Sequence, residues 1–103
     1  MDFVETSMEI IADAGDGKSQ AMEAIQAAKK GDFGRAEELL QNSHNSIVKA
    51  HKNHSGLLFH DADKNDVKVT MLMVHAADHL SGADIIESIA VELVQLYKEV
   101  KHA

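Results

Sequence analysis

The chain has 103 residues, enough for one small domain spanning residues 1–103, and its lack of cysteine excludes disulfides, thiolate metal sites and cysteine nucleophiles. Its formal charge of −7 disfavours binding to nucleic acid or to anionic lipid, because both are themselves negatively charged. No apolar run approaches the roughly 18 residues of a membrane span and no signal-peptide pattern opens the sequence, so we expect a soluble, cytoplasmic protein.

The composition predicts an all-helical fold. Proline and tryptophan are absent, and the only aromatic residues are one tyrosine and three phenylalanines, so aromatic strand runs and proline turns are missing. Alanine, leucine, glutamate and lysine, which favour helices, are common instead.

Helical patterns fill the chain in three stretches. The first runs from about Phe3 to Lys29 and ends at "KKGDF", where Gly31 suits a helix C-terminus and Asp32 suits the next N-cap. The second helix begins there and should end before the polar segment His60–Asp66, which lacks helical periodicity. The third fills roughly Val67–Lys101. Short connections between long helices predict an up-down-up antiparallel three-helix bundle.

Apolar residues recur in each stretch at spacings of three and four, as a bundle seam requires. The first stripe is Val4, Met8, Ile11, Gly15, Ala21 or Met22, Ile25 and Ala28. The second is Phe33, Ala36, Leu40, Ser43, Ile47, Ala50, His54 and Leu57. The third helix has one stripe of Leu72, His75, His79, Gly82, Ile86, Ile89, Leu93, Leu96 and Val100, and another of Met71, Val74, Asp78, Ser81 and Ile85. A helix of a lone bundle should turn a polar face to water, so the extra stripe predicts self-association, with an untidy monomer as the alternative.

The segment "AGDGKS", Ala14–Ser19, resembles the end of a phosphate-binding loop. That motif needs a glycine five positions before Gly17, where Ala12 stands, and a strand upstream, whereas this segment lies in a helical pattern. We therefore reject a nucleotide-binding loop and expect a place where another helix packs close to glycine.

The turn "VHAADHL", Val74–Leu80, brings His75, Asp78 and His79 together in an otherwise apolar stretch. A zinc-protease helix would have glutamate after the first histidine, but Ala76 stands there, so a hydrolase of that class is excluded. Three readings stay open. The two histidines are hydrogen-bonded core groups, or a nucleophilic imidazole with its helpers, or ligands of a transition metal. Further histidines crowd the second helix and keep the metal reading possible: His44, His51, His54 and His60. For His44 and His60 we expect instead polar residues that are solvated or line the seam.

Several stretches together resemble a known family. They are "AGDGKS", "AAKKGDFGRAEELL", "KAHKNHSGLL", "VTMLMVHAADHL" and "VELVQLYKEVK". In this order they are similar to the IIA component of the lactose/cellobiose/N,N'-diacetylchitobiose class of the bacterial sugar phosphotransferase system, over nearly the whole chain. The histidine–aspartate–histidine turn is the most specific part of the resemblance.

The resemblance implies a trimer of three-helix subunits that acts as a phosphotransferase component. His75 would accept a phosphoryl group from the carrier HPr and pass it to a cysteine of the cognate IIB component, and thence to a disaccharide entering through IIC. His79 would support the reaction. Asp78 would meet its symmetry mates around a divalent cation, expected to be Mg²⁺, at the trimer axis; oxygen ligands suit such a hard ion.

The chain departs from the family pattern near this turn. Ala77 replaces the family's glutamine, Ser81 replaces its methionine, and His54 replaces a glutamine in the second helix, where His51 matches. These changes put the polar support of the site in doubt, and they keep open a non-enzymatic, metal-binding or regulatory helical bundle as the alternative. The sequence does not identify the sugar.

Overall fold

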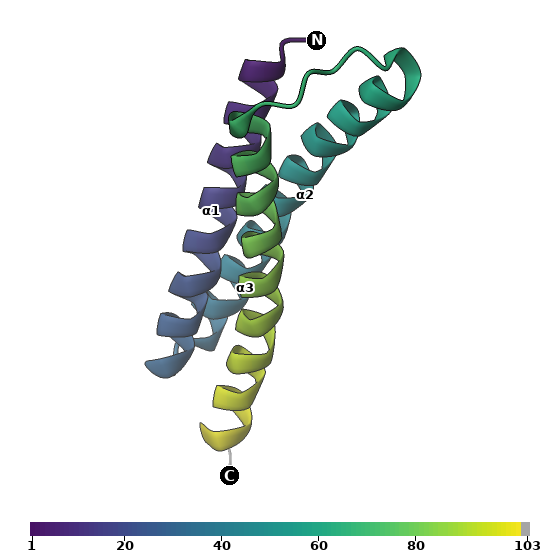
Figure 1. The fold of residues 1–103 in the computed structure, drawn as a ribbon. Coiled ribbons are helices and arrows are strands. Elements are labelled where there is room, and N and C mark those ends of the chain that lie inside the picture. Colours follow the sequence, from purple (N-terminus) through teal and green to yellow (C-terminus); the bar gives the residue numbers. More distant parts are fainter. Residues whose placement is uncertain (102–103) are drawn as a thin grey trace.

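The computed structural model describes residues 1–101, which fold into three helices and no strand. Helix α1 spans Phe3–Lys29, α2 spans Phe33–Lys64 and α3 spans Met71–Lys101. They form a rod of 56 × 18 × 18 Å in which α1 and α3 run in the same direction and α2 runs in the opposite one (Figure 1). The predicted up-down-up bundle is confirmed.

The connection between α1 and α2 is the predicted one. The backbone of Gly31 has a φ of 83°, a left-handed conformation that glycine adopts without strain. Asp32 then caps α2, because its side-chain oxygen accepts from the Arg35 backbone N–H at 3.1 Å. Asp2 caps α1 in the same way, through the Glu5 N–H at 3.0 Å.

The predicted second connection is wrong in position. Helix α2 continues through the polar segment to Lys64, and α3 starts at Met71 rather than near Val67. Polar residues do not stop a helix whose side chains point to solvent. What ends α2 is Asn65 in the left-handed conformation, with a φ of 51°. What starts α3 is Thr70, whose hydroxyl accepts from the Met73 N–H at 3.3 Å.

The core of the bundle is built mainly from small residues, and this corrects the expected stripes. Val4 and Met8 are 64% and 53% exposed, so the start of the α1 stripe faces away from the core, whereas Ile11 packs against it. The residues that α1 buries are Ser7, Ile10, Ala14, Gly17, Ala21, Ala24, Ile25 and Ala28. Those of α3 are Met73, Ala76, Leu80, Ala83, Ala90 and Val94, which belong to neither predicted stripe. The α2 stripe is largely right, except that Leu39 is buried rather than Leu40.

At Gly17 the helices α1 and α2 approach each other closely. A Cβ at this position would lie 2.5 Å from Ile47 Cγ1, well inside contact distance. The Ser43 hydroxyl, fully buried on α2, donates to the Gly17 carbonyl oxygen at 2.7 Å. The glycine of the rejected phosphate-loop motif therefore serves helix packing, as expected.

Polar pairs join α2 to α3 along their shared surface. His44 Nδ1 lies 3.0 Å from Glu87 Oε1, and His51 Nε2 lies 2.8 Å from Asp84 Oδ1. Lys98 pairs with Glu37 further along the same two helices. The C-terminal end of α2 leans away from the other two helices (Figure 1).

Candidate functional site

His75 and His79 face each other on the first turns of α3. Their Nε2 atoms are 3.0 Å apart, and the ring centroids are 4.4 Å apart with an interplanar angle of 79°. A separation of four residues puts both side chains on one face of the helix, so the pair is a direct product of the sequence spacing. The structure therefore brings together the two histidines that the sequence singled out.

The surroundings of the two rings differ. The His75 side chain is exposed, whereas His79 is half-buried and its Nδ1 is a buried atom without a hydrogen-bond partner in the described chain. A buried N–H with no acceptor is costly. We therefore assign the proton of His79 to Nε2, which then donates to the lone pair on His75 Nε2. In this arrangement the exposed ring has its nucleophilic nitrogen held in place by the half-buried one.

Asp78 lies between the two histidines in sequence but points elsewhere. It is exposed and makes no hydrogen bond or ion pair with another residue of the described chain. Within residues 1–101 no three histidine, aspartate or glutamate side chains are close enough to hold a metal ion. A single chain thus gives no support to a histidine metal centre.

The other α2 histidines do not join the pair. His44 and His51 are bound to carboxylates of α3, as described above. His60 Nε2 lies 2.8 Å from Asp66 Oδ1, and its ring packs edge-on against Phe3 at a centroid distance of 5.2 Å. These three have structural roles between helices or at a helix end.

Two departures from the family pattern meet in one cavity. His54 of α2 and Ala77 of α3 both line a hollow of about 210 Å³ between the two helices and the link that joins them. Its other walls are mostly apolar: Leu57, Leu58, Asp61, Val67, Val69, Met73 and Val74. The short side chain at Ala77 is therefore one reason that this space is open.

Large apolar side chains cover the outer face of α3. Met71, Val74 and Ile85 are 82%, 51% and 60% exposed, and they share the predicted second stripe with Asp78. Residues 1–101 leave these three side chains at least half exposed. Exposed apolar patches of this kind mark association surfaces in soluble proteins.

Lys18 of α1 is a neighbour of this site that the sequence reading missed. A Cβ placed on Gly82 would lie 3.6 Å from the Lys18 Nζ, and Gly82 follows His79 by one turn on the same face of α3. In the sequence, Lys18 stands within the rejected phosphate-loop motif. The spacing of residues within α1 does not show which side chains of α3 lie beside Lys18.

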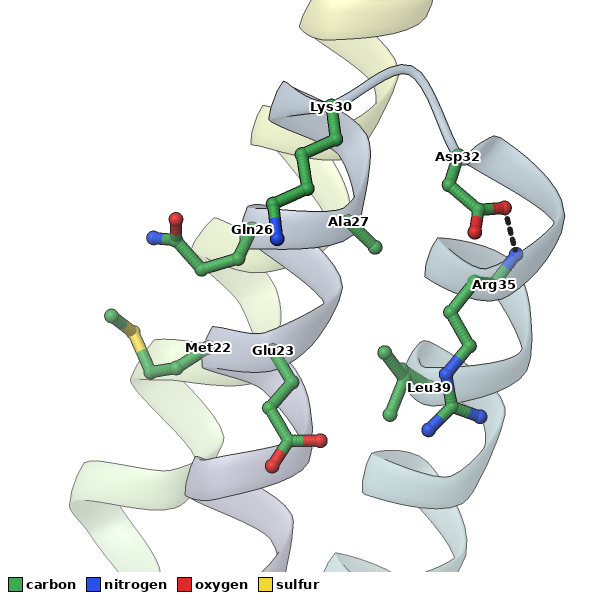
Figure 2. Close-up of a pocket in the computed structure, with 8 residues that line it drawn as sticks. All are labelled: Met22, Glu23, Gln26, Ala27, Lys30, Asp32, Arg35 and Leu39. Atoms are coloured by element: carbon green, nitrogen blue, oxygen red, sulfur yellow. Dashed lines mark hydrogen bonds between the residues drawn. The ribbon is translucent and has the colours of Figure 1, made fainter.

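A cavity of about 410 Å³ lies at the opposite end of the bundle, beside the turn between α1 and α2 (Figure 2). Its walls carry charges of both signs, from Glu23, Lys30, Asp32 and Arg35. It contains no histidine and is distant along the rod from the pair on α3, so we do not assign it to the same site.

None of the helices in residues 1–101 combines the length and the apolarity that crossing a bilayer requires.

Comparison with known proteins gives a consistent result. The sequence profile described as "PTS system, Lactose/Cellobiose specific IIA subunit" matches residues 5–98. The lichenan-specific phosphotransferase enzyme IIA component of Bacillus subtilis is 40% identical over 92 residues, covering 89% of this chain and 84% of that protein. The lactose-specific EIIA component of Streptococcus mutans is 38% identical over 90 residues, covering 87% and 86%.

Solved structures agree with the sequence comparison. The cellobiose-specific enzyme IIA of Bacillus anthracis superposes with a TM-score of 0.93 at 30% identity, covering 99% of this chain and 94% of that one. The IIA(Chitobiose) protein of Escherichia coli, solved in complex with HPr, superposes with a TM-score of 0.86 at 30% identity, covering 98% of each chain.

Proposed function

Because the chain belongs to the lactose/cellobiose-specific IIA family of the sugar phosphotransferase system, we propose that it carries the phosphoryl group on His75. It is a IIA component of the lactose, cellobiose and chitobiose type. The observation that carries the assignment to His75 is the 3.0 Å contact between the two Nε2 atoms, in which the exposed ring is His75. An incoming carrier protein can reach that ring, whereas His79 is half-buried.

The transfer step requires little from the protein besides position. The lone pair of His75 Nε2 attacks phosphorus while the P–N bond to the donor imidazole breaks, and the departing nitrogen keeps the electron pair. The donor ring then takes up one proton from solvent and His75 Nδ1 releases one to it, so that both rings end neutral. The Nε2–H of His79 loses its acceptor when that lone pair forms the new bond, and it then donates to a phosphoryl oxygen. Both states contain a phosphoramidate bond, so the step is close to isoenergetic, and positioning with charge stabilisation suffices.

The family and one similar solved structure indicate the partner proteins. The Escherichia coli IIA(Chitobiose) structure is a complex with HPr, which supports HPr as the donor here. We propose a cysteine of a cognate IIB component as the acceptor. This fits a chain with no cysteine of its own, because the acceptor thiol must then come from a partner. The IIB component would pass the group to a disaccharide of this class at IIC, so that this chain works in the cytoplasm.

We also propose that three copies of the chain assemble around the stripe of α3 that contains Asp78. The exposed Met71, Val74 and Ile85 on this stripe need a covering surface, and a cyclic assembly buries the same face of every copy. Three Asp78 carboxylates would then meet at the axis. Their repulsion would require a cation or protonation, and an all-oxygen donor set fits Mg²⁺ better than it fits a transition metal. Such an ion would supply charge neutralisation to the assembly and takes no part in the transfer step.

The proposed function predicts covalent labelling of the wild-type chain. Incubation with phosphoenolpyruvate, enzyme I and HPr should add about 80 Da, the mass of one phosphoryl group, per chain. The added mass should be lost in acid and kept in base, as expected for a phosphohistidine. Intact-mass measurement decides the matter, and an unlabelled chain beside a fully labelled HPr would contradict a carrier function.

The proposed assembly predicts a mass of about three chains of 11.2 kDa each in sedimentation equilibrium at micromolar concentration. Chelation of divalent cations should lower the melting temperature modestly, because three carboxylates would be left facing one another.

Asp78→Leu is the matched control for the axial site. It should remove the effect of the chelator while keeping the trimer, since apolar packing can replace a buried charge cluster. A monomeric wild type would contradict the assembly, and an Asp78→Leu variant that still responds to chelator would contradict the axial site.

A further inference from the structure

The ammonium group of Lys18 lies on the surface of α3 just beyond the histidine pair. It is held 3.6 Å from where a Gly82 Cβ would stand, and a glycine there leaves the surface open. Helical side chains lean toward the N-terminus of their helix, so the space that a side chain at position 82 would cover lies over the preceding turn. That turn carries His79. The amine therefore lies within one helical turn of the residue that carries the half-buried ring.

Lys18 also differs from every other lysine and arginine in residues 1–101. It is half-buried and forms no ion pair or hydrogen bond with another described residue. Lys98 is the other basic residue that is not exposed, and it is paired with Glu37. A cation that is held near the site without a counter-charge is suited to an anion that is present only part of the time.

A phosphoryl group on the pair would be such an anion. It brings up to two negative charges to a chain whose formal charge is already −7. The neutral His79 N–H supplies one hydrogen bond but no charge. A lysine offers three N–H donors on a flexible four-carbon stem, so it can follow the group as it arrives and leaves.

We propose that Lys18 binds the phosphoryl oxygens when His75 is phosphorylated, and that it stabilises the negative charge spread over those oxygens during transfer. This inference rests on the proposed function. It assigns the cation of the site to α1, so that the anion is held between two helices rather than on α3 alone.

The test compares Lys18→Met, Lys18→Arg and Lys49→Met. Methionine keeps the apolar stem and removes the charge, and Lys49 is an exposed lysine of α2 that pairs with Asp13 of α1. With phospho-HPr as donor, Lys18→Met should accept the group about tenfold to a hundredfold more slowly at low salt, from the loss of one charge at short range. Lys18→Arg should restore most of the rate, and Lys49→Met should match the wild type.

A second readout isolates the contact from any effect on HPr docking. Each variant is phosphorylated chemically with phosphoramidate, and the phosphoryl group is titrated by ³¹P NMR. Lys18→Met should raise the pKa of the phosphoryl group above its wild-type value, because a neighbouring cation favours the dianion. A merely structural role for Lys18 would leave that pKa unchanged.

The outcomes separate the two proposals. A wild type that takes the group from phosphoramidate but not from HPr contradicts the carrier function, and the titration still decides the role of Lys18. Equal transfer rates and equal titrations for Lys18→Met and the wild type overturn the role of Lys18 and leave the carrier function standing. A wild type that neither reagent phosphorylates overturns both.

Discussion

Replacing His75 with glutamine should abolish phosphoryl acceptance from HPr, whereas replacing His79 with alanine should slow it by about tenfold to a hundredfold. Glutamine keeps a polar side chain of similar reach but offers no nucleophilic lone pair, so no covalent bond to phosphorus can form. The His79 change removes the hydrogen bond that orients the reacting nitrogen but keeps the nucleophile itself. Quenched time courses read by intact mass measure both effects, and circular dichroism checks the helical fold.

His44→Gln is the matched control. His44 is a partly exposed histidine that pairs with Glu87 on the other side of α3, so its loss should leave labelling at the wild-type rate. Labelling that persists in His75→Gln would refute the assignment, and labelling lost only in His79→Ala would exchange the two roles. Slow transfer in the wild type would direct attention to Ala77, and Ala77→Gln, whose side chain can extend into the 210 Å³ cavity, is the rescue to try.

Gly17→Ala should lower the free energy of unfolding by about 1–2 kcal/mol. Alanine is the better helix former, but its methyl group would lie 2.5 Å from Ile47 Cγ1, and a branched side chain in a helix has little rotameric freedom to move away. Urea denaturation at fixed protein concentration measures the loss, since stability of an associating chain depends on concentration.

Two further variants test whether the clash is the cause. Gly15→Ala is the matched control on the same helix, where a Cβ would meet nothing within 4 Å, and it should stabilise the chain by about 0.5–1 kcal/mol. In an Ile47→Ala background, Gly17→Ala should no longer cost stability, because the opposing atoms are gone. An equal loss in both backgrounds would show that the close approach at Gly17 is not what glycine is needed for.

The histidine pair could be predicted from the sequence because both residues lie on the same helix. A spacing of four residues fixes the relation of His75 to His79 whatever the rest of the fold does. Lys18 could not be found in this way, because its position beside Gly82 depends on how α1 and α3 pack. The partner of His51 could not be found in this way either, because its contact with Asp84 depends on how α2 and α3 pack.

The fold was predicted correctly in its class and topology and incorrectly in which faces meet. The stripe predicted for α1 contains large apolar residues such as Val4 and Met8, whereas the buried face of α1 is formed mostly by alanine, serine and glycine. Closely packed helices need small side chains between them, and a hydrophobicity pattern gives those residues little weight. The same preference for bulk misplaced the first stripe of α3, whose buried residues are instead Met73, Ala76, Leu80, Ala83, Ala90 and Val94.

The end of α2 illustrates a second limit. The polar run after His60 resembled a loop by composition, yet it contains no glycine or proline, and the helix continues through it to Lys64. The stop at Asn65 depends on a backbone conformation that composition does not reveal.

The placement of small residues inside and large ones outside has a consequence for how the chain must be made. A bundle whose core consists largely of alanine buries little apolar surface within one chain. In the proposed trimer, much of the other apolar surface is buried only by contacts between copies. The folded fraction then depends on how many chains are synthesised near one another. A newly made copy would expose methionine, valine and isoleucine until it meets its partners, so the gene dose and the rate of translation become part of its stability.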